Sequence, residues 1–150
     1  MNIVVAIDFS EITSAVLAAL PNLLRGLPAR NTQIHLLHVA EPEPEFVGWD
    51  AGPDVVQEQV AEEFERRVRS LTQLSESLSS QLDTSVTPLL VRGPTAETVC
   101  KQADSLNATM IVVGSHGHGA AYDLVVGSVS AAIIKQSSRP VLVIPVKRSD

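Results

Sequence analysis

Five short, mainly apolar runs alternate with longer segments of helical periodicity along this chain. The runs occupy residues 3–7, 34–39, 84–91, 109–113 and 141–146, and a helical pattern separates each run from the next. Short apolar runs of this kind are typical of strands that are buried on both faces. Their regular alternation with helices predicts one parallel sheet with helices on both of its faces.

Length and charge limit the class of protein further. The chain has 150 residues, no internal repeat and no break in composition, so we expect a single domain over residues 1–150. A net charge of −6 argues against a general partnership with nucleic acids or anionic membranes. No apolar run approaches the roughly 20 residues that a membrane-spanning helix needs, and no signal peptide is apparent. A soluble, cytoplasmic protein is expected, and the lone Cys100 fits a reducing compartment.

A glycine-containing segment joins the fourth apolar run to the last helical pattern. It reads G-S-H-G-H-G-A-A-Y-D-L-V-V-G-S, and its glycines Gly114, Gly117 and Gly127 follow the spacing G-x2-G-x9-G-S. A strand, a glycine loop and a helix N-terminus in this order hold phosphate in α/β proteins, because backbone N–H groups and the positive end of the helix dipole face the anion. The segment therefore predicts nucleotide binding.

Three of the predicted strands end in residues that could meet a ligand. In open parallel sheets, ligands bind beside the carboxyl ends of the strands, near the point where the strand order reverses. Asp8 ends the first strand, Val39 ends the second and Gly114 follows the fourth, so these residues are expected at one edge. Asp8 either accepts hydrogen bonds from a ligand or caps the next helix together with Ser10. No partner at a recognisable spacing favours Asp8 as a catalytic base.

Polar side chains around the glycines are further candidate contacts. Ser128 either caps the last helix or donates its hydroxyl to a phosphate, and the upstream glycines favour the phosphate. Ser130, in the first turn, either donates a second hydroxyl or faces solvent. His116 and His118 either contact phosphates or add polarity to the loop, and the missing third ligand disfavours a metal site.

The remaining polar and aromatic features have less specific interpretations. His35 and His38, on the second strand, are expected to be ordinary core or surface histidines. The stretch 41–65 contains nine carboxylates and neither Lys nor Arg, which indicates a solvated face. Within it, Phe46 and Trp49 either cover the site, contact a partner chain or pack in a small satellite cluster.

Common catalytic signatures are absent from the sequence. It contains no G-x4-G-K-[ST] loop, no G-x-S-x-G elbow, no H-E-x-x-H and no paired cysteines. A G-x-G-x-x-G pattern after the first strand is also missing, which disfavours a nicotinamide cofactor. We therefore assign no catalytic residue and no metal ligand.

Over nearly its whole length the chain resembles the universal stress protein family. The similar segments are V-V-A-I-D-F-S (4–10), L-L-H-V (36–39), V-R-G-P-T-A-E-T-V (91–99), I-V-V-G-S-H-G (111–117), G-S-V-S (127–130) and R-P-V-L-V-I-P (139–145). The resemblance implies a three-layer Rossmann-like fold, of the adenine nucleotide alpha hydrolase type. It also implies a five-stranded parallel sheet of order 3-2-1-4-5 and a homodimer formed through the last strand, residues 141–146.

The resemblance further implies the branch of the family that binds ATP or AMP. By this similarity, Asp8 and Val39 contact the adenine and ribose end, with Ile7 beside them. The phosphate end is formed by Gly114, His116, Gly117, Gly127, Ser128, Val129 and Ser130. The implied role is a sensor or signalling module in the stress response, whose protein partner the sequence does not identify. The alternatives are slow ATP hydrolysis and a nucleotide-free interaction dimer.

The spacer between the second and third glycines departs from the pattern of that branch. Members often carry Lys or Arg there, whereas residues 118–126 contain neither and include Asp123. Backbone amides alone neutralise less of a triphosphate than amides and a cation together. We therefore expect either that AMP or ADP is held relatively well or that ATP requires Mg²⁺.

Overall fold

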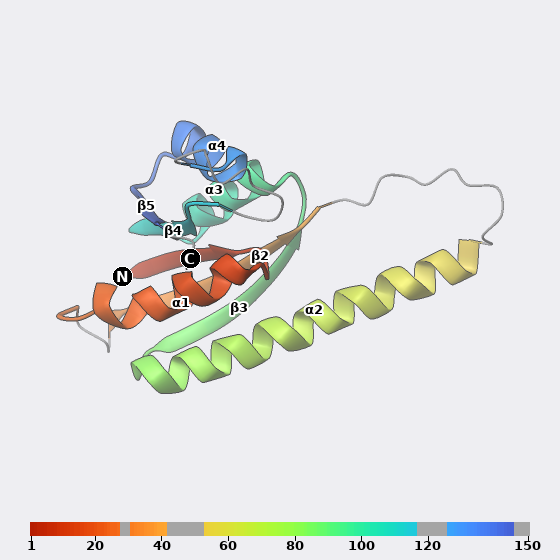
Figure 1. Ribbon diagram of the computed structural model, residues 1–150, viewed down its shortest axis with the longest axis horizontal. Coiled ribbons are helices and arrows are strands. Elements are labelled where there is room, and N and C mark those ends of the chain that lie inside the picture. The colour runs from red at the N-terminus through yellow and green to blue at the C-terminus, as the bar shows by residue number, and fades with distance from the viewer. Residues whose placement is uncertain (28–30, 42–52, 117–125, 146–150) are drawn as a thin grey trace, which may run out of the picture.

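The computed structural model describes residues 1–27, 31–41, 53–116 and 126–145. Strands and helices alternate throughout these residues, as the sequence predicts (Figure 1). In chain order the elements are β1 (Asn2–Ile7), α1 (Glu11–Leu23), β2 (Gln33–Ala40), α2 (Pro53–Leu82), β3 (Ser85–Arg92), α3 (Thr95–Ser105), β4 (Met110–Gly114), α4 (Ser128–Gln136) and β5 (Val141–Ile144).

All strand pairs in the sheet are parallel, and the strand order is β3-β2-β1-β4-β5. In the central part of the sheet, Val5 of β1 aligns with Leu36 of β2 and with Val112 of β4. In chain order, β2 and β3 are added on one side of β1, and β4 and β5 then follow on its other side. The predicted α/β fold and its order 3-2-1-4-5 are therefore confirmed, and the strand order reverses between β1 and β4.

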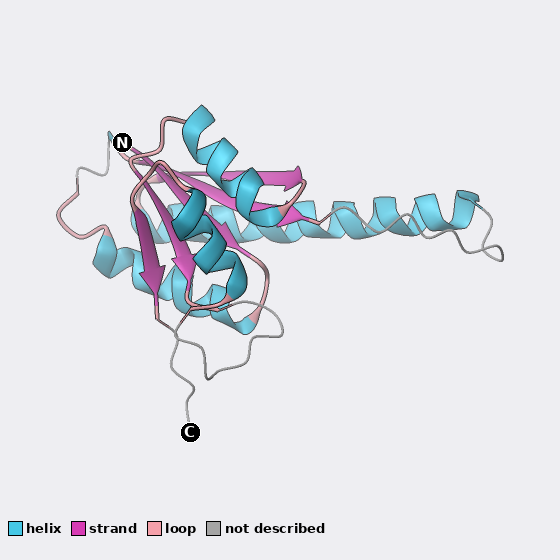
Figure 2. Cartoon of the chain, turned by 90° about the horizontal axis from the view of Figure 1, so that it is seen from above, coloured by secondary structure: helices cyan, strands magenta, loops and turns pink. Residues whose placement is uncertain are grey.

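Each face of the sheet has its own hydrophobic core, because successive side chains of a strand point to opposite faces. Ile3, Val5 and Leu36 pack against α1 and α2 on one face. Val4 and Leu37 pack against α3 and α4 on the other face. Figure 2 shows helices on both sides of the sheet. Double coverage explains why the strands read as continuous apolar runs rather than as alternating patterns.

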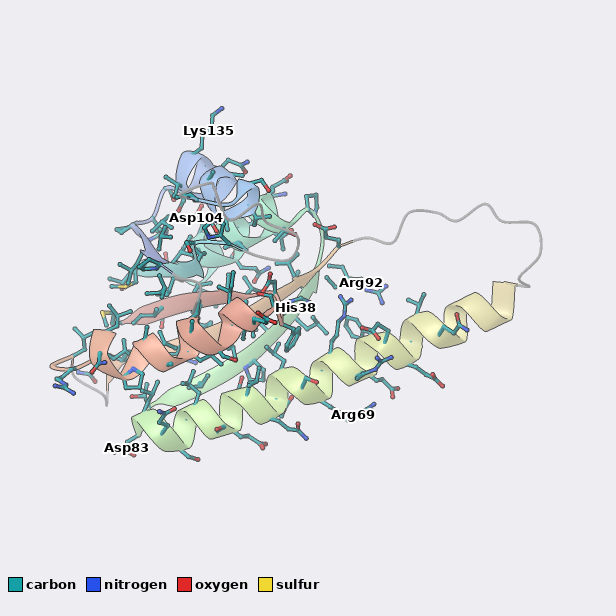
Figure 3. All side chains as sticks on the ribbon, in the orientation of Figure 1. His38, Arg69, Asp83, Arg92, Asp104 and Lys135 are labelled. Carbon is teal, nitrogen blue, oxygen red and sulfur yellow. The ribbon has the colours of Figure 1, made fainter. Side chains whose placement is uncertain are left out.

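The long helix α2 covers the sheet only with its C-terminal part. Leu71 and Leu78 are buried in the core, whereas Val68 is 40% exposed. Towards its N-terminus the helix extends past the end of β3, as Figure 1 shows. At that point the guanidinium of Arg92, which is labelled in Figure 3, lies 4.8 Å from the centre of the Phe64 ring. No helix in the described part of the chain is long and apolar enough to span a membrane.

Candidate functional site

Two hydrogen bonds hold the end of β4 against the start of α4. The Gly127 N–H donates a hydrogen bond to the Ser115 carbonyl over 2.6 Å. The Ser130 hydroxyl donates to the Gly114 carbonyl over 2.7 Å. We call these two hydrogen bonds the β4–α4 clasp. Because of the clasp, Gly114 and Ser115 lie next to the first turn of α4 at the carboxyl edge of the sheet.

The clasp changes the interpretation of Ser130. Its side chain is buried, with 7% of the residue exposed, so the expectation that it faces solvent is wrong. The hydroxyl hydrogen is engaged by the Gly114 carbonyl rather than directed outward. Ser130 therefore contributes to the position of the helix, and its hydroxyl is not a free donor in this structure.

The first turn of α4 presents main-chain N–H groups that the described part of the fold leaves unused. Among the described residues, no acceptor takes a hydrogen bond from the N–H of Ser128, Val129 or Ser130. The first N–H groups of any helix lack intrahelical partners, and they carry the positive end of the helix dipole. Gly127 is the N-cap and offers no side chain, so Ser128 does not act as the cap. Ser128 and Val129 are both exposed.

Gly114 is required by the packing of α1 against β4. A Cβ atom at this position would lie 2.4 Å from Cγ2 of Ile12 and 3.3 Å from Cγ2 of Val16. Carbon atoms in ordinary contact are about 3.5–4.0 Å apart. The absence of a side chain thus allows α1 to lie close to the end of β4, whether or not a ligand is bound.

Asp8 is engaged in the turn that leads from β1 into α1. Its Oδ1 accepts hydrogen bonds from the Ser10 N–H at 3.0 Å and from the Ser10 hydroxyl at 2.6 Å. Ser10 in turn is the N-cap of α1, and its Oγ accepts from the Ile12 N–H at 3.3 Å. Of the two roles expected for Asp8, the capping role with Ser10 is therefore present in the structure.

Two buried histidines lie on β2, each 6% exposed. The Nδ1 of His38 lies 2.9 Å from the Ile7 carbonyl, and because a carbonyl only accepts, this nitrogen carries the hydrogen. The His38 ring also contacts the Phe9 ring, with 4.6 Å between the centroids. For His35, neither ring nitrogen has a hydrogen-bond partner among the described residues. Burial lowers the pKa of His35 below its usual range.

Val39 lies where the pairing between β1 and β2 has ended. The last pair of these two strands is Ile7 with His38, whereas β2 stays paired with β3 through Ala40 and Arg92. The side chain of Val39 belongs to the core beneath α3 and is only 7% exposed. A ligand beside the end of β1 would therefore meet the main chain of Val39 rather than its side chain.

Part of the predicted site lies outside the described residues. His116 is half-buried, and its Nδ1 lies 2.9 Å from the Ser115 hydroxyl. Gly117 and His118, and the aromatic residues Phe46 and Trp49, are not among the described residues. In the described ranges, no group of three or more His, Cys, Asp or Glu side chains is arranged to hold a metal ion.

Sequence reasoning did not anticipate His38 or the clasp. His38 lies near the carboxyl end of a buried strand that is parallel to β1, and this place near the edge of the sheet was the available signal. The two hydrogen bonds of the clasp join residues that are 12 and 16 positions apart, and no local pattern indicates them.

Together, the sheet order and the strand–glycine–helix arrangement at its carboxyl edge define a Rossmann-like α/β protein. The sequence profile of the universal stress protein family matches residues 1–145. The chain belongs to this family.

Individual relatives agree with that membership. Universal stress protein A homolog 2 from Coxiella burnetii is 31% identical over 125 residues, which are 80% of this chain and 79% of that protein. Universal stress protein MJ0577 from Methanocaldococcus jannaschii is 32% identical over 96 residues, 59% of each chain. The solved MJ0577 structure covers 99% of this chain and 97% of its own, with a TM-score of 0.74 and 26% identity.

A third relative was solved with a ligand. It is a universal stress protein from Archaeoglobus fulgidus in complex with dAMP, with a TM-score of 0.58 and 24% identity. The match covers 96% of this chain and 97% of that one. At this identity the likeness shows the shared fold.

Proposed function

We propose that this single-domain universal stress protein binds an adenine nucleotide at the carboxyl edge of β1 and β4. The binding would serve a cytoplasmic sensor or signalling role in the stress response. One observation carries the proposal: the N–H groups of Ser128, Val129 and Ser130 have no acceptor among the described residues, and the clasp fixes their helix beside β4. N–H groups arranged in this way are suited to phosphate oxygens. The dAMP complex of the Archaeoglobus fulgidus relative supports the choice of ligand class.

The two ends of the nucleotide would meet different parts of the edge. The phosphates would face the three N–H groups, the Ser128 hydroxyl and the glycine segment with Gly114, His116, Gly117 and Gly127. The adenine and ribose would lie towards β1 and β2, beside Ile7, Asp8 and Val39. Because the Gly127 N–H and the Ser130 hydroxyl are used in the clasp, their contribution would be to hold the helix in place.

The lack of a cation in the spacer sets the expected preference among nucleotides. Residues 118–126 carry no Lys or Arg, so a triphosphate would rely on main-chain amides, or on Mg²⁺, for neutralisation. Isothermal titration calorimetry with AMP, ADP and ATP, each with and without Mg²⁺, tests this preference. Metal-free ATP that binds much more tightly than AMP would contradict it.

The edge strand supports a homodimer. β5 lies at one end of the sheet order, and its residues are only half-buried. An uncovered edge can pair with a strand of another chain. We propose that a second copy pairs along residues 141–146, of which the structure describes the strand Val141–Ile144. Analytical ultracentrifugation reports the oligomeric state directly.

Substitutions at Ser128 separate what its main-chain N–H contributes to the affinity for the nucleotide from what its hydroxyl contributes. Ser128 is the first residue of α4, a position where proline is well tolerated because its N–H has no helical partner. Gly127, with φ −68° and ψ 162°, already has the extended backbone that precedes proline. Ser128→Pro therefore removes one N–H and one hydroxyl without disturbing the helix, whereas Ser128→Ala removes the hydroxyl alone.

We expect Ser128→Pro to weaken AMP binding by about 10- to 150-fold, since a hydrogen bond to a charged group is worth about 1.5–3 kcal/mol. The loss should exceed that of Ser128→Ala, and the thermal stability of the free protein should not change. Calorimetric titration and thermal unfolding of both variants make the comparison. If Ser128→Pro binds AMP as tightly as Ser128→Ala, the N–H group does not contact the ligand.

A further inference from the structure

His38 touches the residues on both sides of Asp8. Its Nδ1–H donates to the carbonyl of Ile7, the last residue of β1, over 2.9 Å. Its ring lies against Phe9, with a centroid separation of 4.6 Å and an interplanar angle of 57°. Figure 3 shows His38 beside the first turn of α1, where the chain turns from β1 into that helix. One buried side chain of β2 therefore contacts both chain neighbours of Asp8.

That turn has a backbone conformation that needs support. Phe9 has φ +59°, in the left-handed region that side chains other than glycine seldom adopt. The contact of its ring with His38 helps to hold this conformation. Within this turn, the Asp8 carboxylate faces the Ser10 N–H and hydroxyl at the start of α1. A side chain of the neighbouring strand thus packs against the turn that orients Asp8.

We propose that His38 is a positioning residue for the adenine and ribose end of the nucleotide site. This inference rests on the proposed nucleotide binding. His38 is also the pairing partner of Ile7 in the sheet, so its main chain and its side chain both hold the end of β1. Its role requires the tautomer with hydrogen on Nδ1, because that nitrogen donates to the carbonyl. In the sheet order, β4 and the proposed phosphate end at α4 lie on the other side of β1 from β2.

The chain contains a matched control for this role. His35 lies three residues earlier on β2, is equally buried and points to the opposite face. It has no hydrogen-bond partner among the described residues. Replacing either histidine by leucine removes a buried imidazole from the same strand, but only the change at His38 frees the turn that carries Asp8.

The experiment compares three variants by calorimetric titration with AMP, ADP and ATP. His38→Leu is expected to weaken all three nucleotides by about tenfold and by the same factor, because they share the adenine and ribose. His35→Leu should stay within about twofold of the wild type. His38→Asn, whose Nδ2–H can still reach the Ile7 carbonyl, should bind better than His38→Leu. If His38→Leu does not fold, His38→Phe, which keeps a ring beside Phe9 but lacks the donor, should still weaken all three nucleotides by one common factor, smaller than about tenfold.

Other results would overturn the inference. Wild-type affinity in a folded His38→Leu or His38→Phe protein would show that the turn needs no support from His38. Equal losses of affinity in the His35 and His38 variants would show a general effect of a buried histidine on β2. A loss of affinity that grows with the number of phosphates would place the effect at α4. A wild-type protein that binds no nucleotide would refute the proposed function itself, whereas binding that His38→Leu leaves unchanged would refute this inference alone.

Discussion

The Gly114→Ala substitution tests whether the first glycine of the loop serves packing. The added Cβ would lie 2.4 Å from Cγ2 of Ile12, more than 1 Å inside the usual contact distance of about 3.5–4.0 Å. Ile12 and Val16 are buried at 7% and 1% exposure, so α1 has to shift or strain. Overpacking of this kind costs about 1–3 kcal/mol of unfolding free energy. For a protein of this size, that corresponds to a fall in Tm of about 2–12 °C.

A second substitution identifies the clash as the cause. Leucine has no methyl group on its β carbon, so Ile12→Leu removes the atom nearest to the added Cβ and conserves side-chain volume. Urea and thermal unfolding of the two single variants, the double variant and the wild type, all without nucleotide, form a double-mutant cycle. We expect the double variant to lose clearly less stability than the sum of the single losses. Additive losses, or a Gly114→Ala protein as stable as the wild type, would refute the packing argument.

Two further substitutions address the clasp and the buried histidine. Ser130→Ala removes the hydroxyl that donates to the Gly114 carbonyl. It should lower the unfolding free energy of the nucleotide-free protein by about 1–2 kcal/mol, as measured by urea unfolding. An unchanged unfolding free energy would mean that this hydrogen bond does not stabilise the fold. His35 has a lowered pKa in the folded protein, so the unfolded chain takes up a proton first as the pH falls through about 6.5. Wild-type stability should therefore fall between pH 7.5 and 5.5 relative to His35→Leu, and parallel pH profiles of Tm would contradict this.

The sequence predicted the fold well because the relevant signals are local and repeated. Each strand is short and apolar, a helical pattern separates it from the next, and the last helix, Ser128–Gln136, follows the glycine segment as predicted. Strand ends were less certain. The second strand was predicted over 34–39 but extends over Gln33–Ala40, because its length depends on pairing with β3 at both ends. Apolar periodicity carries no information about where a neighbouring strand ends.

The site was predictable only where its contacts are local. The pairing of Asp8 with Ser10 spans two residues, and the sequence named it as one of two alternatives. The tertiary contacts were not predictable. Gly114 is fixed by Ile12, about 100 positions away in the sequence, and His38 contacts the end of a strand that lies 31 positions before it. Such pairs become visible only when the register of the strands is known.

The glycine and serine pattern therefore combines two kinds of position. Gly114, the Gly127 N–H and the Ser130 hydroxyl are used inside the fold, by packing and by the clasp. The N–H groups at the start of α4 have no acceptor among the described residues, and the Ser128 side chain is exposed; these are the positions that we propose for an anion. Loss of an internal position should destabilise the protein with or without ligand, whereas loss of an outward position should change affinity alone. Since both kinds of change would lower the proposed nucleotide binding in an assay at a single temperature, stability and affinity have to be measured on the same variants before a residue is assigned to the ligand.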